Sequence, residues 1–448
     1  MFYLIILLAL FNYSLFSQTI LSKNWYLFDR ENSPLPSNRI TSLLYDRNTN
    51  VYWIGCGWEF QGNDTIKGGL VRFDGENWTV YNSTNSPLTN DLAEYLAIDA
   101  NNRLLIANWG EGFYIFDGAN WEIYNSNNSP MPSNELQCIS ADMNNNIWIG
   151  INGYGAMKYD GFNWTLFDHN NAFNGIWDLN FIRADSSGII WFGSEYDGLY
   201  SYDGINWTKE GVGILADSIS LSSFALDRNH NVLFAGNILY VASGFLAQFD
   251  GLNWSYFDSS SIGYSTRFSY NTLTVDSNNH KFIGSAKGLL KFDDNIWTLF
   301  SSYNSPIPYN IFTVGTTDKY NNKIYGLRAN RPPHPTGYAG LIFFNEDSVV
   351  VTSVNDNNFE LNNYKLYQNY PNPFNPHTVI SFQIPVAGKV TIKLFDILGR
   401  EIETIIDEER TVGIHSINFN GNYLTSGIYF YSISVNDFHQ TKKMVLLR

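Results

Sequence analysis

The sequence predicts an all-β chain: a seven-bladed β-propeller of four-stranded blades, followed by an immunoglobulin-like β-sandwich. Two observations predict the propeller. A tryptophan-centred phrase recurs at near-constant spacing, and the segments between its copies are short aromatic or β-branched runs bounded by Asn, Asp and Gly. One observation predicts the second domain. The repeat stops after residue 351, and alternating strands resume beyond a proline-rich segment.

Composition and charge exclude two broad classes of protein. Aromatic residues make up 17% of the chain and charged residues 15%, which argues against disorder. The net charge of −15 lies almost entirely before residue 365. An acidic body repels phosphate backbones, so nucleic acid is excluded as a partner. Cys56 and Cys138 fall in non-adjacent repeats and are predicted as small buried residues rather than a disulfide.

Residues 1–17 predict a signal peptide. The apolar run Phe2–Phe11 is too short to span a bilayer comfortably and stands at the extreme N-terminus, and cleavage after Ser17 fits. A buried N-terminal strand is the alternative. No later segment is apolar for long enough to cross a membrane, so the mature protein is not expected to span one.

The repeat is expected to build a propeller from residues 18–351. Its anchor is the tryptophan of Asp-Gly-x-Asn-Trp-Thr, and 43 residues separate Trp78 from Trp121 and Trp121 from Trp164, a typical blade length. The anchors are Trp25, Trp78, Trp121, Trp164, Trp207, Trp254 and Trp297, with Val349 in the eighth place. Eight anchors bracket seven repeats. One terminal strand is therefore left to complete the last blade, and the strand around Trp25 is the candidate.

One repeat shows all four strands of a blade. They are predicted at residues 136–140, 146–150, 155–159 and 163–167, and Asp160-Gly161 supplies the tight hairpin between the last two. A single sheet of this kind cannot bury both of its faces. Seven sheets stacked radially would cover one another, with the recurring tryptophan packed between adjacent blades.

A second recurring phrase marks the second of the four strands predicted in each repeat. Trp53-Ile54-Gly55, Trp148-Ile149-Gly150 and Trp191-Phe192-Gly193 are each followed by a Gly-Leu or Gly-x-x-Lys/Arg-Phe/Tyr-Asp segment, and residues 24–351 thereby resemble two-component regulator propeller repeats. Four repeats depart from the phrase, for example Leu105-Ile106-Ala107. In that family such propellers are often periplasmic sensors of membrane-bound kinases. No transmembrane or kinase segment follows in this sequence, so the signalling role is not expected here.

Residues 352–364 are predicted to be a polar linker, and residues 365–448 resemble the type A C-terminal sorting domain of the type IX secretion system. The resemblance rests on an opening Gln-Asn-Tyr-Pro-Asn-Pro-Phe-Asn-Pro and on four later marks. Its motif residues are Asn372, Pro373, Phe374, Asn375, Pro376, Gly399, Gly427 and Lys443. It implies the type IX secretion machinery as a partner and passage through the periplasm to the outer cell surface or the medium. An ordinary immunoglobulin-like accessory module is the alternative.

Motifs for catalysis or cofactors are not found in the sequence. Asp-x-Asn-x-Asn segments such as 142–146 resemble calcium loops, but the required Gly and distal Glu are missing, and turn chemistry explains them better. His169 and His334 are not at ligand spacing. No metal site and no cofactor are therefore predicted, and an enzyme is considered less favoured than a binding protein.

The face bearing the loops after the second strands is the candidate ligand face. The three long repeats take their extra residues there, and Trp58, Trp109, Glu195 and Tyr196 are predicted to contact a ligand, with an extracellular glycan or protein as the partner. Packing between blade tops is the alternative for each residue. The predicted function is a non-catalytic binding propeller. A secreted polysaccharide hydrolase or lyase, using rim carboxylates such as Glu111 and Glu195, remains the second hypothesis.

Overall fold

The computed structural model describes residues 19–22, 24–61, 64–168, 170–172, 178–195, 197–210, 219–238, 243–258, 270–328, 338–346, 364–367, 369, 372–410 and 413–447. These residues form strands and turns, and none of them is helical. Accordingly, no helix that could cross a bilayer is found among them. The predicted signal peptide at 1–17 and most of the predicted linker at 352–364 lie outside the described residues.

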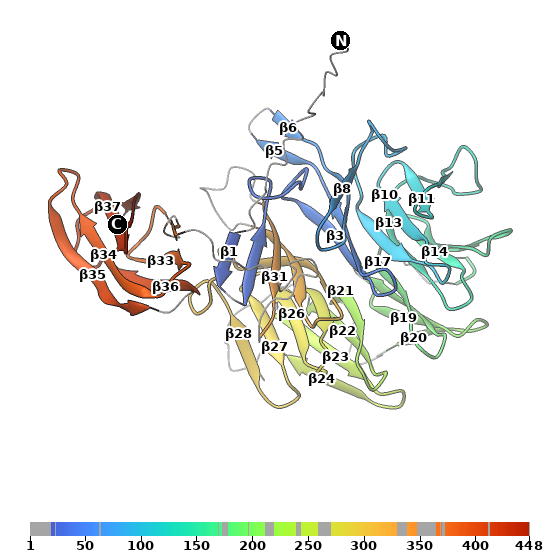
Figure 1. Cartoon of the computed structure of the whole chain (residues 1–448). Coiled ribbons are helices and arrows are strands. Elements are labelled where there is room, and N and C mark those ends of the chain that lie inside the picture. The colour runs from blue at the N-terminus through green and yellow to red at the C-terminus, as the bar shows by residue number, and fades with distance from the viewer. Residues whose placement is uncertain are drawn as a thin grey trace, which may run out of the picture.

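Seven antiparallel sheets of four or five strands form between residues 19 and 346 in the described part of the chain, and we number them blades 1 to 7 in chain order (Figure 1). From the innermost strand outward, blade 1 contains β3 (Ile40–Asp46), β4 (Val51–Cys56), β7 (Gly69–Phe73) and β8 (Trp78–Tyr81); blade 2 contains β9 (Tyr95–Ile98), β10 (Leu104–Asn108), β11 (Gly112–Phe116) and β12 (Trp121–Tyr124); and blade 3 contains β13 (Leu136–Ala141), β14 (Ile147–Ile151), β15 (Gly155–Tyr159) and β16 (Trp164–Phe167). Blade 4 contains β17 (Leu179–Ala184), β18 (Ile190–Ser194), β19 (Leu199–Tyr202) and β20 (Trp207–Glu210); blade 5 contains β21 (Ile219–Leu226), β22 (Val232–Ile238), β23 (Ser243–Phe249) and β24 (Trp254–Asp258); and blade 6 contains β25 (Tyr270–Val275), β26 (Lys281–Ser285), β27 (Leu289–Phe292) and β28 (Trp297–Phe300). Blade 7 has five strands, β29 (Ile311–Thr317), β30 (Lys323–Arg328), β31 (Tyr338–Phe344), β2 (Trp25–Phe28) and β1 (Thr19–Ser22).

The seven inner strands form a closed ring. Each of β3, β9, β13, β17, β21, β25 and β29 contacts the next in this order, and β29 contacts β3. The second strands of the blades are almost completely buried, because a neighbouring blade covers each of their faces. The predicted propeller fold is confirmed.

A strand from the N-terminal part of the chain completes blade 7. Strand β2 pairs with β31, so that Trp25 stands opposite Phe344, and the two rings stack with centroids 4.0 Å apart. The prediction that the Trp25 region completes the last repeat is confirmed. Val349, the predicted eighth anchor, lies outside the described residues.

The recurring tryptophans pack between adjacent blades, as predicted. The ring centroid of Trp78 in blade 1 lies 5.5 Å from that of Phe28 in blade 7. The centroid of Trp207 in blade 4 likewise lies 5.4 Å from that of Phe167 in blade 3. Both tryptophans are half-buried. One aromatic side chain from the fourth strand of each blade therefore covers the neighbouring blade.

A β-bulge interrupts six of the seven inner strands near their N-terminal ends. The register shifts at Thr41, Gln137, Asn180, Ser222, Asn271 and Thr313–Val314. An extra residue in a bulge cannot continue the ladder, so its side chain is free to bond elsewhere. Several of these side chains bond to the backbone of the next blade, which links the blades around the axis.

The C-terminal residues form two sheets that share one core. One sheet contains β32 (Lys365–Leu366), β33 (His377–Ile384) and β36 (Gly413–Asn420); the other contains β35 (Glu401–Arg410), β34 (Gly388–Phe395), β37 (Gly427–Val435) and β38 (Phe438–Leu446). Phe382 and Ile384 of the first sheet and Ile392 and Tyr431 of the second belong to a single buried cluster. These sheets agree with the predicted sandwich, and their immunoglobulin-like connectivity stays a prediction.

Candidate functional site

The loops after the second strands lie on one face of the ring, which we call the rim. Neighbouring strands of each blade are antiparallel, so every second strand ends on the face where every inner strand begins. The hairpins after the first and third strands lie on the opposite face for the same reason. The rim loops therefore bring equivalent positions of successive blades to one surface.

The rim loop of blade 1 is folded as its own hairpin. Strands β5 (Glu59–Gln61) and β6 (Asp64–Ile66) pair within it, and the side chain of Phe60 is 63% exposed. Trp58 precedes this hairpin. Its indole N–H donates a hydrogen bond of 2.7 Å to the carbonyl of Asn90, in the segment that leads to blade 2, and its side chain is half-buried. Trp58 therefore fastens the hairpin to the neighbouring blade.

Exposed aromatic residues occupy the same loop in the next two blades. Trp109 follows β10 and is 43% exposed, and Tyr154 follows β14 and is 45% exposed. The backbone N–H of Trp109 donates to a carboxylate oxygen of Glu94 at 2.8 Å, which holds the loop in place. Phe60, Trp109 and Tyr154 therefore form an aromatic arc over three consecutive blades. The sequence prediction missed Phe60 and Tyr154, although the recurring loop position was a signal for both.

Glu195 lies two blades away from Trp109. It follows β18 in blade 4, is half-buried, and its backbone N–H donates to the carbonyl of Asp178 at 3.2 Å. No hydrogen bond or ion pair joins it to Trp58 or Trp109 in the described part of the chain. Trp58 and Trp109 lie on adjacent blades. Tyr196, the fourth predicted residue, lies outside the described residues.

The carboxylate of Glu111 is already held by three side chains of the protein. It accepts hydrogen bonds from the Thr89 hydroxyl, from Nδ2 of Asn108 at 3.0 Å and from the Tyr114 hydroxyl at 3.1 Å. Burial, followed by the charge of Glu111, raises the pKa of Tyr114, so the phenol remains a donor. A carboxylate with three protein donors suits a structural role better than proton transfer to a substrate.

The Asp-x-Asn-x-Asn segments form tight turns on the opposite face. In blade 3 the Oδ1 atom of Asp142 accepts from the backbone N–H groups of Asn144 and Asn146, both at 2.9 Å, and its Oδ2 accepts from the Asn146 amide at 2.7 Å. The same pattern recurs at Asp227 and Asp318. A cation would have to displace these donors, which supports the turn interpretation over a calcium loop.

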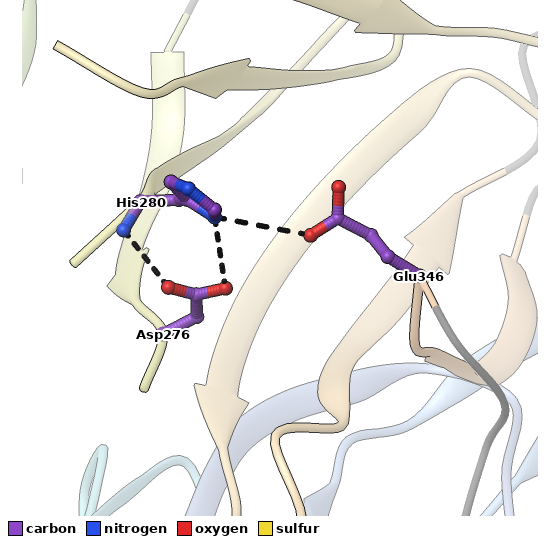
Figure 2. A group of neighbouring side chains, drawn as sticks. All are labelled: Asp276, His280 and Glu346. Carbon is purple, nitrogen blue, oxygen red and sulfur yellow. Dashed lines mark hydrogen bonds and ion pairs between the residues drawn. The ribbon is translucent and has the colours of Figure 1, made fainter. Parts of the chain in front are cut away.

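One cluster offers metal-ligand atoms in close proximity. Figure 2 shows Asp276, His280 and Glu346, whose ligand atoms lie within 4.8 Å of one another. Two ammonium groups already occupy the same carboxylates: Nζ of Lys323 lies 3.3 Å from Asp276, and Nζ of Lys291 lies 2.6 Å from Glu346. The cluster is therefore an ion network that joins blade 6 to blade 7.

A second group of rim residues comes together only through ring closure. The guanidinium carbons of Arg39 and Arg328 each lie 5.6 Å from the ring centroid of Tyr338, a cation–π distance. Arg39 belongs to blade 1, and Arg328 and Tyr338 belong to blade 7. The sequence analysis did not predict these contacts.

The motif residues of the C-terminal domain fasten its opening segment to its last strand. Oδ1 of Asn372 accepts from the backbone N–H of Val445 at 2.7 Å, and its Nδ2 donates to the carbonyl of Lys443 at 3.1 Å. Phe374 is 2% exposed and exchanges backbone hydrogen bonds with Val445 and Leu447. The carbonyl of Pro376 accepts from the N–H of Gly421 at 2.8 Å.

The remaining motif residues lie at edges and turns. Gly399 has a φ of 78° in the hairpin between β34 and β35, a conformation that favours glycine. Gly427 begins β37 opposite Leu446, and Lys443 stands opposite Phe430. Pro373, Asn375 and Lys443 are exposed. The beginning of the domain is thus bound to its end, and part of the motif remains accessible.

The fold and these contacts define a β-propeller followed by a small two-sheet domain. Residues 368–447 match the family model of the secretion system C-terminal sorting domain. The predicted type IX sorting domain is thereby confirmed, and the protein is exported to the cell surface or beyond it. None of the curated proteins is significantly similar to the sequence.

Solved structures support the propeller. PorZ of Porphyromonas gingivalis, an essential surface component of its type IX secretion system, has 17% identity and a TM-score of 0.54 over 94% of this chain and 60% of its own. The extracellular domain of the putative one-component system BT4673 of B. thetaiotaomicron has 14% identity and a TM-score of 0.55 over 92% and 57%. Virginiamycin B lyase of Staphylococcus aureus has 11% identity and a TM-score of 0.53 over 71% and 98%. The chain thus spans about three fifths of the length of PorZ and of the BT4673 domain. At sequence identities this low, the similarity to these structures shows a shared fold and nothing more.

Proposed function

We propose that this exported propeller is a non-catalytic binding protein whose rim contacts an extracellular glycan. The observation that carries the proposal is the aromatic arc: Phe60, Trp109 and Tyr154 occupy equivalent loops of three consecutive blades and are 63%, 43% and 45% exposed. Tyr196 stands at the equivalent sequence position in blade 4. The proposed organisation is a signal peptide at 1–17, the propeller at 18–351, a linker at 352–364 and the sorting domain at 365–448.

The chemistry of the arc suits sugars. Aromatic rings present flat apolar faces on which the C–H faces of pyranoses stack, and neighbouring polar groups bind the hydroxyls. The carboxylate of Glu195 has no hydrogen-bond partner within the described residues and is half-buried in the next rim loop. Large aromatic side chains left in water contribute nothing to folding, whereas a ligand would cover them.

The hydrolase or lyase hypothesis has less support. It requires two carboxylates at a glycosidase separation of roughly 5–10 Å. Glu111, in blade 2, is held by three donors of the protein, from Thr89, Asn108 and Tyr114. Glu195 lies in blade 4. The likeness to a lyase concerns the fold alone.

A glycan array probed with the full chain tests the proposal. Trp109→Ala and Tyr154→Ala should each weaken binding by about tenfold or more, because one stacked aromatic contributes roughly 1–3 kcal/mol, and should leave the melting temperature unchanged. Phe162→Ala is the matched control, because Phe162 is 91% exposed on the opposite face. Equal losses in all three variants, or no glycan bound by the wild type, would refute the proposal.

Trp58 is expected to behave differently from Trp109. Its indole bridges to Asn90, so Trp58→Ala should lower stability by roughly 1–2 kcal/mol. Urea denaturation of Trp58→Ala and of Trp109→Ala would measure the difference in their free energies of unfolding. Equal stability of the two variants would remove the structural role assigned to Trp58.

A further inference from the structure

A cavity of about 270 Å³ lies inside the ring of blades. It is lined by residues from the inner strand of each of the seven sheets. Its wall includes Glu94, the residue before β9, so the cavity reaches the rim end of the inner strands. Small-molecule sites typically have volumes of roughly 300–1,000 Å³. This cavity is therefore of a size for a ligand no larger than a monosaccharide.

Two bulged asparagines supply hydrogen-bond acceptors to the wall. Nδ2 of Asn180 donates to the carbonyl of Leu221 at 2.9 Å, and Nδ2 of Asn271 donates to the carbonyl of Phe312 at 2.8 Å. These bonds fix both amides against the next blade. Their Oδ1 atoms accept no hydrogen bond from the described residues, and each can accept one from a ligand hydroxyl.

Arg183 places a positive charge in the same cavity. Its Nη1 donates to the carbonyls of Ile182 at 2.9 Å and Ile139 at 3.2 Å, which fixes the guanidinium. No carboxylate lies within 4 Å of it in the described part of the chain. Burial lowers its pKa, but an arginine stays protonated in proteins. The neighbouring thiol of Cys138 gives no countercharge, because burial raises its pKa.

Glu94 also lines the cavity, but its carboxylate is already engaged. It accepts from the backbone N–H of Trp109 at 2.8 Å, and it makes no ion pair with Arg183 among the described residues. Glu94 belongs to blade 2 and Arg183 to blade 4. The guanidinium therefore keeps unused N–H donors and an uncompensated charge inside a polar cavity, and an oxyanion is the group that satisfies both.

We propose that this cavity binds a small hydroxy acid, such as a single sugar acid, whose carboxylate pairs with Arg183 and whose hydroxyls donate to Asn180 and Asn271. The site goes beyond the glycan contact proposed for the rim. The planar guanidinium fork matches a carboxylate, and the amide oxygens distinguish a hydroxylated acid from a simple anion. The ligand class is thus set by one cation and two acceptors.

Isothermal titration calorimetry of the full chain with D-glucuronate tests the proposal, with D-glucose and inorganic phosphate as comparison probes. The wild type should bind one glucuronate saturably and bind glucose and phosphate at least about tenfold more weakly. Arg183→Gln should weaken glucuronate binding by about tenfold or more. Arg228→Gln, an exposed arginine on the opposite face, is the matched control and should bind like the wild type.

Arg183→Lys covers the case in which the glutamine variant does not fold, because it keeps the charge and loses only the planar fork. It should fold and still bind glucuronate more weakly than the wild type. Trp109→Ala should leave glucuronate binding intact, which separates this site from the rim. Unchanged binding in Arg183→Lys and Arg183→Gln, equal affinity for glucose or phosphate, or absence of glucuronate binding to the wild type would each overturn the proposal.

Discussion

The indole N–H of Trp148 donates a hydrogen bond of 3.0 Å to the Oδ2 atom of Asp142, and both side chains are buried in blade 3. Blade 4 repeats the bond at 2.8 Å between Trp191 and Asp185. The aspartate of the first hairpin therefore holds its own turn and also anchors the tryptophan of the second strand. This double use explains why an acidic residue recurs at that turn without a cation.

Asp142→Ala should destabilise the propeller by roughly 2–4 kcal/mol, because it removes a charged acceptor and leaves the buried indole N–H of Trp148 unsatisfied. Urea denaturation measures the loss. Asp160→Ala, in a fully exposed turn, should have a much smaller effect on stability. Calcium should leave the melting temperature of the wild type unchanged. A rise in that temperature with calcium, abolished in Asp142→Ala, would contradict the turn interpretation.

Asn145 combines strain and an inter-blade bond. Its φ is 65°, and its Oδ1 accepts from the backbone N–H of Ala100 in blade 2 at 2.8 Å. Asn145→Gly should cost about 1 kcal/mol through the lost bond alone, and Asn145→Ala roughly 1 kcal/mol more through the left-handed backbone. Denaturation midpoints of the two variants test the order. Equal stability of the alanine and glycine variants would show that the backbone carries no strain there.

The ion network predicts a pH-dependent effect at Lys323. Burial alone raises the pKa of Asp276, but Lys323 and the neighbouring donors outweigh it and hold that pKa below its usual value. The interaction therefore contributes stability above about pH 4 and loses it as pH falls through the lowered pKa. Lys323→Met should destabilise by roughly 3 kcal/mol near pH 7, since both partners are buried, and by less near pH 3.

Lys291→Met is the matched control for this effect, because Lys291 and its partner Glu346 are more exposed. It should cost about 1 kcal/mol or less. Urea midpoints at the two pH values measure both variants. A loss in Lys323→Met that stays constant between them would mean that the Asp276 carboxylate is not the group left unpaired.

The hairpin between β34 and β35 predicts a contact with the export machinery. Ile397 and Leu398 are 67% and 73% exposed at its tip, which the hydrogen bonds from Leu398 and Arg400 to Asp396 keep rigid. Replacing both apolar residues by Asp should leave melting unchanged and reduce secretion about tenfold or more, because each apolar side chain buried in a contact contributes roughly 1.5–3 kcal/mol.

Secretion would be measured in a host with a type IX system, by the ratio of protein in the medium to protein in cells. Val386→Asp, 57% exposed in another turn of the same domain, is the control. Normal secretion of the tip variant would exclude the tip from recognition. Deletion of residues 365–448 should retain the protein inside the outer membrane.

The repeat predicted the blades well because the same packing recurs in each. The four strands expected between residues 136 and 167 are observed within one residue of their predicted limits. The tryptophan phrase also predicted the closing strand, since an unpaired anchor at Trp25 requires a partner. Local periodicity is sufficient for these elements, because each is fixed by contacts that repeat.

The candidate sites depended on features that a single sequence does not display. Arg183 faces the cavity because the bulge at Asn180 shifts the side-chain alternation of β17, and a one-residue shift moves every later side chain to the other face. Tyr338 meets Arg39 only because the ring closes. The sequence predicted Trp58 as an aromatic residue of the rim that contacts a ligand. Its hydrogen bond to Asn90 depends on how the segment between blades 1 and 2 folds, which the sequence does not show.

The strand order of blade 7 also fixes the order in which the molecule can mature. Strand β2 is synthesised among the first residues, yet its partner β31 follows more than 300 residues later. Until then the early segment can pair only with β1, as a local hairpin that shields one of its two edges. Completion of the propeller must therefore await translation of residues 338–344. Any product truncated before them retains an unpaired strand edge, which makes it a substrate for aggregation or proteolysis rather than for export.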